Sequence, residues 1–496
     1  MTEAPSLAAS LAAIGDREWS LLIGGQPAPA RSGRSFGDES PVTEEIIATV
    51  PDGDAADVGA AVEAARPAAA AWRRVPPRER GALVGELARV LEENADELAL
   101  LDAIDGGHPV TGMHLDVAIA ADMLRLFAGL GIELKGSTIP ATAQNLHLTV
   151  REPFGVVGRI IPFNHPVMFA AGKIAAPLVA GNAVILKPPE SAPLSALRMG
   201  ELFAGVLPPG LLSVVVGDGP AAGRAVARHP AIRRIGFIGS DATGRAIQRD
   251  AAEVGVKDVT LELGGKNALI AFPDADPEAV AAGAVAGMNF ARSAGQSCGS
   301  TSRLLLHESI ADDVLDRVAE RMSAIRIGSP LDPATQMGTV ATRAQYDKTL
   351  RYIGIARDEG AQVLTGGGRP PGLEDERGLF VAPTLFRGVR PDMRIAREEV
   401  FGPVLAAITW KDEDEAIEIA NAVDYGLTGS VWTSDINRAF RVASALEAGY
   451  LWINGSAAHF AGVPFGGVKL SGVGREESLD ELLSYTQLKT LNIMLG

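Results

Sequence analysis

Alternation between strand-like and helix-like segments, beginning near residue 155, limits the fold of this chain more than any other feature of its sequence. Short runs of branched apolar residues alternate with longer helix-like runs. Such alternation produces a parallel sheet that is covered by helices on both faces. The predicted strands are residues 155–161, 183–187, 212–216 and 234–237, a predicted helix spans 167–180, and a second series runs from about 266 to 475. The sequence therefore predicts an α/β fold with two such units.

Two other parts of the chain depart from this pattern. Residues from about 51 to 129 are predicted to be helical, because Leu83, Leu87, Val90 and Leu91 are spaced to share one helix face. Residues 133–152 predict an exposed β-ribbon, and residues 485–495 are again strand-like. At 496 residues the chain is too long for one ordinary core, so we expect two large domains and a smaller element.

Charge and cysteine content narrow the functional classes. A formal net charge of −16 argues against a general nucleic-acid-binding protein. The first residues show no basic leader before an apolar run, and no apolar stretch is long enough to span a membrane. Cys298 is the only cysteine, so an internal disulfide is excluded. We therefore expect a cytoplasmic protein with no nucleic-acid or membrane partner.

Cys298 lies among small residues, in Gly295-Gln296-Ser297-Cys298-Gly299-Ser300. A loop of small residues lets the backbone approach a ligand and exposes the thiol. A nucleophilic cysteine is one interpretation of this segment. An inert buried cysteine is the commoner alternative for a single residue of this type.

Glu262 and Asn164 each come at the end of a predicted strand. Glu262 stands in the apolar segment Leu261-Glu262-Leu263, where burial would raise the pKa of the carboxyl group and make it a usable general base. Asn164 directly follows the strand at 155–161, and its amide is suited to donate a hydrogen bond to an oxyanion. The alternatives are a surface glutamate and an asparagine turn before proline.

Two further strand ends carry groups suited to a nucleotide. The strand near residue 235 runs into Gly239 and Ser240 and then a predicted helix, whose free N–H groups favour a phosphate. The surrounding text is not G-x-G-x-x-G, so the ordinary dinucleotide fingerprint is absent. Lys187 and Glu190 end another strand and are suited to hydrogen-bond ribose hydroxyls, unless they belong to a solvent-facing loop.

These segments, in this order, resemble the aldehyde dehydrogenase superfamily. The resemblance extends to Glu398-Glu399-Val400-Phe401-Gly402-Pro403, and to the run 464–469 followed by Ser471-Gly472 and Gly474-Arg475-Glu476. It covers the chain from about residue 23 to 495. It implies the non-acylating, NAD(P)-dependent branch, which oxidises an aldehyde to a carboxylic acid through a cysteine thiohemiacetal and a thioester.

The resemblance also implies a role for each matching residue. Cys298 matches the nucleophile, Glu262 the general base and Asn164 the oxyanion donor, and Lys173 with Glu476 matches a pair proposed to move protons. The implied cofactor-binding residues, which would hold NAD in preference to NADP, are Ile161, Pro162, Phe163, Lys187, Glu190, Gly239, Ser240, Leu263, Glu399 and Phe401. No metal is expected.

The implied architecture has three parts. Residues 1–131 and 152–263 form a Rossmann-like NAD-binding domain, residues 264–476 an α/β catalytic domain, and residues 132–151 with 477–496 a small β bridging and oligomerisation element. The ribbon and the tail would leave strand edges unpaired in a monomer, so we expect a dimer or a tetramer.

Departures from the family pattern concern the substrate tunnel. Small residues at Gly172 and Gly299 suggest a roomy tunnel, and no charged anchor is identified in it. The predicted lining is Ile119, Met123, His165, Ser297, His459 and Phe460. Two alternatives remain open. A CoA-acylating enzyme often lacks the carboxylate that Glu262 provides, and a catalytically retired binding protein would not be expected to keep Cys298, Glu262 and Asn164 together.

Overall fold

The computed structural model describes residues 7–495, and its first large sheet contains the first alternating series. The strand order is β2-β1-β9-β8-β7-β10-β11-β21, with parallel pairing from β9 to β11 and antiparallel strands at both ends. The strands are β1 (Leu21–Ile23), β2 (Gln26–Ala28), β7 (Val156–Ile160), β8 (Ala183–Lys187), β9 (Leu212–Val214), β10 (Ile232–Ile238), β11 (Asp258–Glu262) and β21 (Gly472–Val473). The predicted strand at 183–187 is confirmed with the same bounds.

Helices cover this sheet, because β7 and β8 are buried along their whole length and need apolar cover on both faces. The predicted helix at 167–180 is confirmed as α6, which starts one residue earlier. The helices of this part are α1 (Leu7–Gly15), α2 (Ala55–Trp72), α3 (Pro77–Glu93), α4 (Ala95–Gly106), α5 (Val110–Leu130), α6 (Pro166–Ala180), α7 (Leu194–Ala204), α8 (Arg224–Arg228) and α9 (Asp241–Val254). A hairpin of β3 (Ser35–Ser40) and β4 (Glu45–Pro51) precedes α2.

The second large sheet holds the second alternating series, in the order β14-β15-β16-β13-β12-β18-β19. All its pairs are parallel except β14 with β15. Its strands are β12 (Ala268–Ala271), β13 (Arg303–His307), β14 (Gln362–Thr365), β15 (Thr384–Arg387), β16 (Val404–Trp410), β18 (Thr428–Trp432) and β19 (Tyr450–Ile453). Its helices are α10 (Pro277–Gly287), α11 (Phe290–Ser293), α12 (Ala311–Ser323), α13 (Arg343–Asp358), α14 (Arg394–Arg397), α15 (Glu413–Asn421) and α16 (Ile436–Ala445).

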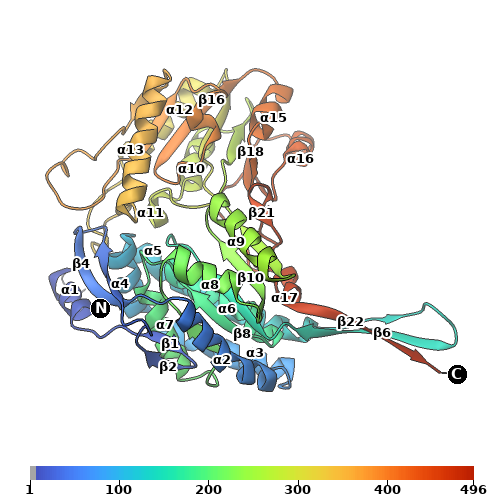
Figure 1. The fold of residues 1–496 in the computed structure, drawn as a ribbon. Helices are drawn as coiled ribbons and strands as arrows, with labels where there is room; N and C mark the ends of the chain where they lie inside the picture. The colour runs from blue at the N-terminus through green and yellow to red at the C-terminus, as the bar shows by residue number, and fades with distance from the viewer. Residues whose placement is uncertain (1–6, 496) are drawn as a thin grey trace.

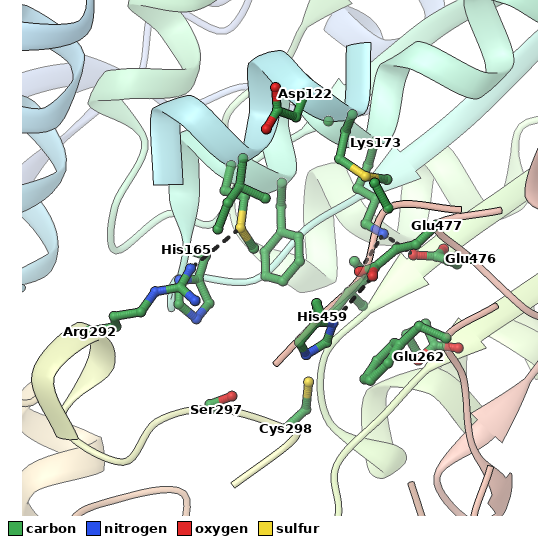
Figure 2. A pocket seen from close by; sticks show the side chains of 18 of the residues that line it. Asp122, His165, Lys173, Glu262, Arg292, Ser297, Cys298, His459, Glu476 and Glu477 are labelled. Atoms are coloured by element: carbon green, nitrogen blue, oxygen red, sulfur yellow. Dashed lines mark hydrogen bonds and ion pairs between the residues drawn. The ribbon is translucent and has the colours of Figure 1, made fainter. Parts of the chain in front are cut away.

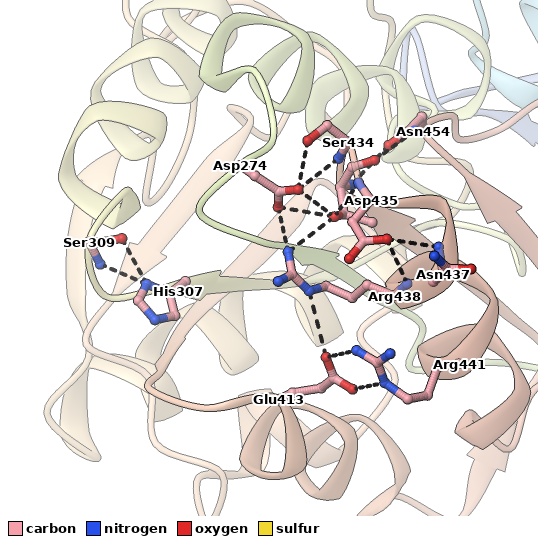
Figure 3. Close-up of polar contacts among 11 residues, drawn as sticks. Asp274, His307, Ser309, Glu413, Ser434, Asp435, Asn437, Arg438, Arg441 and Asn454 are labelled. Atoms are coloured by element: carbon pink, nitrogen blue, oxygen red, sulfur yellow. Dashed lines mark hydrogen bonds and ion pairs between the residues drawn. The ribbon is translucent and has the colours of Figure 1, made fainter.

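Charged side chains fasten the outer helices of this second sheet (Figure 3). Asp274, just after β12, accepts hydrogen bonds from Thr433, Ser434 and Arg438 at the start of α16. Arg441 on α16 donates in turn to Glu413 at the start of α15, with an Nε–Oε1 distance of 2.6 Å. The network holds α15 and α16 together at one edge of the sheet.

The predicted ribbon and tail pair with each other. β22 (Thr486–Met494) lies antiparallel to β6 (Asn145–Pro153) over nine residue pairs, and β6 also pairs with β5 (Thr138–Ile139). This small sheet projects away from the two large sheets (Figure 1). The sequence predicts unpaired strand edges in both the ribbon and the tail. In the structure the two segments pair with each other, and the outer edge of β22 has no partner strand among residues 7–495.

The mixed α/β architecture with parallel sheets confirms the predicted fold class. Residues 1–6 and 496, at the ends of the predicted NAD-binding domain and oligomerisation element, lie outside the described residues. Within residues 7–495, no helix combines the length and apolar character required to cross a bilayer. The remaining elements are the helix α17 (Leu479–Ser484), the short helical turns η1 (Gly131–Glu133) and η2 (Gly219–Gly223), and the short pair of β17 (Tyr425–Gly426) with β20 (Val468–Lys469).

Candidate active site

Neighbouring parallel strands bring several of the predicted site residues to one edge of the first sheet. Asn164 follows β7, Gly239 and Ser240 follow β10, and Glu262 ends β11. These three strands are adjacent in the sheet, so their carboxyl ends open on the same side. The backbone N–H of Gly239 donates to the Glu262 carbonyl at 3.0 Å, which joins two of these strand ends directly.

Cys298 lies in the loop between α11 and β13, at the facing edge of the second sheet. The Asn267 side chain donates to the Cys298 carbonyl at 2.7 Å and to the Ser300 carbonyl at 2.9 Å, which fixes the backbone at Cys298 and directly after it. Gln296 is buried and accepts a hydrogen bond from Ala341 N–H. Sequence reasoning missed Asn267, although its position two residues after Gly264-Gly265 was a signal.

A cavity of about 240 Å³ lies between these two sheet edges. Cys298, Glu262, Lys173 and Glu476 all line it, so the structure brings four predicted catalytic residues to one space (Figure 2). The predicted tunnel residues that line it are Ile119, Met123, His165, Gly172, Ser297 and His459. Two tunnel predictions are wrong. Phe460 is 57% exposed and Gly299 is buried behind the loop, and neither lines the cavity.

Glu262 is buried, and its two carboxylate oxygens hydrogen-bond to none of the described residues. Burial raises the pKa of this carboxyl group well above its usual range, and the negative charge of Glu476 raises it further. Gly466 leaves room for the carboxylate, because a Cβ there would lie 2.7 Å from Oε1 of Glu262. The group is thus a carboxylate with a strong tendency to accept a proton.

The thiol of Cys298 is partly exposed to the cavity. Burial disfavours the charged thiolate and raises the pKa of the thiol to about 12. The negative charge of Glu262 is the next largest cause. Formation of the nucleophilic thiolate therefore requires a nearby proton acceptor. Cys298 also packs against the aromatic cluster of Tyr450, Trp452 and Phe465.

Lys173 on α6 and Glu476 form a buried ion pair with an Nζ–Oε2 distance of 2.8 Å. Arg159 on β7 contacts the other oxygen of Glu476 at 2.7 Å. Burial alone would raise the pKa of Glu476, but the charges of Arg159 and Lys173 outweigh it and hold the pKa at about 2. Glu476 is therefore a weaker base than Glu262, although both line the cavity.

Asn164 is buried beside the Cys298 loop but does not line the cavity. Its amide nitrogen donates to the Gln296 carbonyl at 2.8 Å, which ties the first sheet to the nucleophile loop. An amide nitrogen carries two hydrogens, so this bond orients the group and leaves one hydrogen for another acceptor.

The predicted cofactor residues near the two sheet edges also converge. Glu399 is held against the Gly264-Gly265 turn, where Oε1 accepts from Gly265 N–H at 2.9 Å. A Cβ at Gly264 would lie 2.2 Å from the same carboxylate, so this position requires glycine. Phe401 meets Phe163 edge-to-face, with ring centroids 6.0 Å apart. Burial raises the pKa of Glu399.

The other predicted cofactor residues follow the first sheet along its edge. Lys187 is buried and pairs with the half-exposed Glu190 at 2.8 Å. Ser240 caps α9 by accepting from Thr243 N–H. The backbone N–H of Ile161 donates to the Lys187 carbonyl, and that of Leu263 donates to the Ser471 carbonyl. Pro162 is partly exposed.

Sequence reasoning missed two polar clusters on the cavity wall. Asp116 on α5 accepts from both His165 and Arg292 behind the cavity wall, and Arg292 lines the cavity as a charged residue that the sequence analysis did not identify. Across the cavity, Nδ1 of His459 lies 3.2 Å from Oε2 of Glu477. Both clusters join residues that are far apart in the chain.

Comparison with known proteins agrees with this geometry. Residues 29–491 match the aldehyde dehydrogenase family model. The chain is 47% identical over 464 residues to the aldehyde dehydrogenase tropH of Talaromyces stipitatus, covering 92% of this chain and 90% of that protein. It is 41% identical to a hydroxyisobutyraldehyde dehydrogenase of Mycolicibacterium austroafricanum, covering 96% and 94%.

Among solved structures, an NAD⁺ complex of an aldehyde dehydrogenase from Bacillus cereus superposes with a TM-score of 0.95 and 37% identity, covering 100% of both chains. The family match extends over most of the chain, and the cavity holds a cysteine and an unpartnered carboxylate. The chain belongs to the aldehyde dehydrogenase family.

Proposed function

We propose that this chain oxidises an aldehyde to its carboxylic acid with NAD as the acceptor, through a thiohemiacetal and then a thioester on Cys298. The observation that carries the proposal is the shared cavity of Cys298 and Glu262, in which Glu262 is buried without a hydrogen-bond partner among the described residues. A nucleophile and a base of raised pKa in one small cavity are what two-step acyl chemistry requires.

In the first step, the thiolate of Cys298 attacks the aldehyde carbon and forms a tetrahedral alkoxide. The backbone N–H of Cys298 and the free hydrogen of the Asn164 amide are the donors proposed for the alkoxide. The Gln296 contact fixes the amide of Asn164 before substrate binds. Loss of one such donor typically slows a reaction roughly 10²–10³-fold.

In the second step, Glu262 takes a proton from the water that hydrolyses the thioester. Burial favours the protonated form of Glu262, which gives the ionised carboxylate a strong drive to accept that proton. We propose that Lys173 and Glu476 position this end of the cavity, because Glu476 is held ionised by two cations and is a weak base.

The residues at the sheet edge fit NAD. The start of α9 offers free N–H groups beside Ser240 for a pyrophosphate, and Lys187 with Glu190 offers a donor and an acceptor for ribose hydroxyls. Glu399, fixed on Gly265, offers a second carboxylate near Cys298 for the other ribose. When bound, NAD accepts the hydride of the tetrahedral adduct.

This assignment extends to the parts of the chain. We propose that residues 1–131 with 152–263 bind NAD, that residues 264–476 carry the nucleophile, and that 132–151 with 477–496 join copies of the chain. The free thiol of Cys298 suits the reducing cytoplasm that the sequence predicts.

Glu262→Gln tests the mechanism. The variant should release NADH in a burst near one equivalent per site, slowed to the extent that Glu262 also takes the proton of Cys298, and should then stall, because hydrolysis loses a base worth roughly 10²–10⁴-fold. Intact mass should show an acyl adduct on Cys298. Steady turnover at the wild-type rate without an adduct would assign water activation to another group.

The wild-type protein tests the two alternative functions. Acceleration of its turnover by CoA would favour the acylating enzyme, and no NADH with any aldehyde would favour a catalytically retired binding protein.

A further inference from the structure

One wall of the Cys298 cavity is built from polar side chains on three separate elements. Arg292 comes from the short helix α11, His165 immediately precedes α6, and Asp116 lies on α5. Arg292 and His165 line the cavity together with Cys298 (Figure 2). Asp116 is fully buried behind them.

Asp116 orients the other two side chains. Its Oδ2 lies 2.6 Å from Nδ1 of His165, and its Oδ1 accepts from Nη2 of Arg292. Burial would raise the pKa of Asp116, but the positive charges of His165 and Arg292 outweigh it and lower the pKa. Asp116 is therefore an ionised anchor that occupies one nitrogen of each partner.

The remaining nitrogens of these two side chains have no acceptor. Within residues 7–495, no protein group accepts a hydrogen bond from Nε or Nη1 of Arg292. The same holds for Nε2 of His165. Of these three atoms, Nε of Arg292 is buried. His165 itself is only 6% exposed. The Arg292 side chain is 24% exposed, so its free donors are open to an acceptor that enters the cavity.

The size and chemistry of the space restrict that acceptor. A cavity of about 240 Å³ is smaller than the roughly 300–1,000 Å³ typical of sites for drug-sized ligands, so the ligand is small. A guanidinium carries donors on all three nitrogens, so Nη1 of Arg292 can donate to a carboxylate oxygen while Nη2 stays on Asp116. Nε2 of His165, the ring nitrogen that does not face Asp116, is the second polar atom of this wall that a ligand can meet.

Other charged groups on the wall do not compete for the same position. Asp122 lies apart from Arg292 at the upper side of the cavity in Figure 2, and its side chain is 73% exposed. Glu477 is engaged by His459 and lies 3.6 Å from the Lys173 ammonium. The guanidinium of Arg292 is therefore the cationic group of this cavity with donors left for a ligand.

Resting on the proposed function, we infer that the substrate is a small aldehyde carrying a carboxylate at its far end, and that Arg292 and His165 bind this carboxylate while the aldehyde carbon meets Cys298. Arg292 is then a residue that determines specificity, and Asp116 is a positioning residue that holds it.

The test compares chain-matched substrates. Values of kcat/KM are measured for 4-oxobutanoate against butanal, 5-oxopentanoate against pentanal and 6-oxohexanoate against hexanal. The wild-type enzyme should prefer the oxo acid at one of these lengths. Arg292→Met should lower that preference about 10- to 100-fold, the loss typical of a hydrogen bond to a charged group. Arg292→Lys, which keeps the charge but not the guanidinium, should give an intermediate preference.

Asp122→Asn is the matched control, because it removes a charge from the same cavity but not from this wall, and it should keep the oxo-acid preference. A second measurement needs no variant. Alkylation of Cys298, the only cysteine, by iodoacetamide should be slowed by a dicarboxylate of the preferred length and not by the matching diamide.

A wild-type enzyme that oxidises alkanals as well as oxo acids at every length would overturn the inference and leave the proposed function standing. An equal loss on both substrate types in Arg292→Met, with no protection by the dicarboxylate, would give Arg292 a structural role only. Failure to oxidise any aldehyde would instead contradict the proposed function itself.

Discussion

The ammonium nitrogen of Lys173 lies 2.8 Å from Oε2 of Glu476, with side chains only 5% and 3% exposed. Lys173 belongs to α6 of the first sheet, whereas Glu476 follows β21 and precedes α17. The pair thus fastens the C-terminal part of the chain beneath the cavity that holds Cys298. Arg159 on β7 completes the cluster, so Glu476 is balanced by two cations.

Glu476→Gln is expected to lower the free energy of unfolding by about 3–5 kcal/mol, because it removes the nearest negative charge from two buried cations. Urea denaturation of the free enzyme measures the change. Glu152→Gln is the control, because its pair with Lys489 has side chains 31% and 52% exposed and should contribute less than about 1 kcal/mol. Equal losses in both variants would show that the buried cluster contributes no more to the free energy of unfolding than the exposed pair of Glu152 and Lys489.

The pH dependence of turnover follows from the raised pKa of Glu262. Below this pKa the carboxyl group is protonated and cannot accept a proton from water, so hydrolysis of the thioester should slow as pH falls. The acylation burst depends on the Cys298 thiolate and should follow a different profile. Stopped-flow measurement of both phases across pH separates them. Loss of the low-pH limb of steady turnover in Glu262→Gln is the expected result, and an unchanged limb would assign it elsewhere.

The raised pKa of Glu262 also makes the free energy of unfolding depend on pH. A carboxyl group whose pKa is raised by folding binds protons more tightly in the folded state. Its contribution is present below the unfolded pKa of about 4.3 and is lost as pH rises through the folded pKa. Glu262→Gln should therefore stabilise the chain more at alkaline pH than at acidic pH, as measured by Tm in paired buffers.

Local sequence patterns were sufficient for the sheet and for residues at strand ends. Apolar runs bounded by glycine located β7 and β8, and the ends of parallel strands necessarily share one edge, so Asn164 and Glu262 were predictable site residues. Cys298 alone left an inert buried cysteine as the commoner alternative, and the role proposed for it came from the resemblance of several motifs in order along the chain.

Tertiary pairing was not predictable from local patterns. Asp116 lies on α5, where an aspartate in a helix ordinarily faces solvent, and its partner Arg292 is 176 positions further along the chain. Only the packing of α5 against the Cys298 loop reveals the pair. Phe460 was also predicted to line the tunnel, but it is 57% exposed and does not line the cavity.

Cofactor preference is expected to depend on Glu190. Its carboxylate lies 2.8 Å from the Lys187 ammonium, at the position proposed for the ribose that carries the extra phosphate in NADP. Glu190→Gln should raise kcat/KM with NADP about 5- to 10-fold, because one like-charge repulsion is removed. Glu39→Gln, a carboxylate that lines the same surface pocket, is the control and should change little. Equal effects of the two variants would point to general charge and not to Glu190.

Self-association is expected to use the projecting sheet of β6 and β22. Within residues 7–495 the outer edge of β22 has no partner strand, and Leu488, Leu491, Ile493 and Met494 along it are exposed. Unpaired backbone groups beside exposed apolar side chains favour pairing with a second copy. We therefore predict a dimer or a dimer of dimers at micromolar concentration.

The double substitution Leu491→Lys with Ile493→Lys places two charges on one face of β22 and should raise the monomer fraction in sedimentation velocity. Thr490→Lys adds a charge to the opposite face, which carries Leu488 and Met494, so the two variants show which face of β22 lies in the interface. A wild-type chain that sediments as an active monomer would contradict the prediction, and an assembly unchanged by both variants would place the interface away from β22.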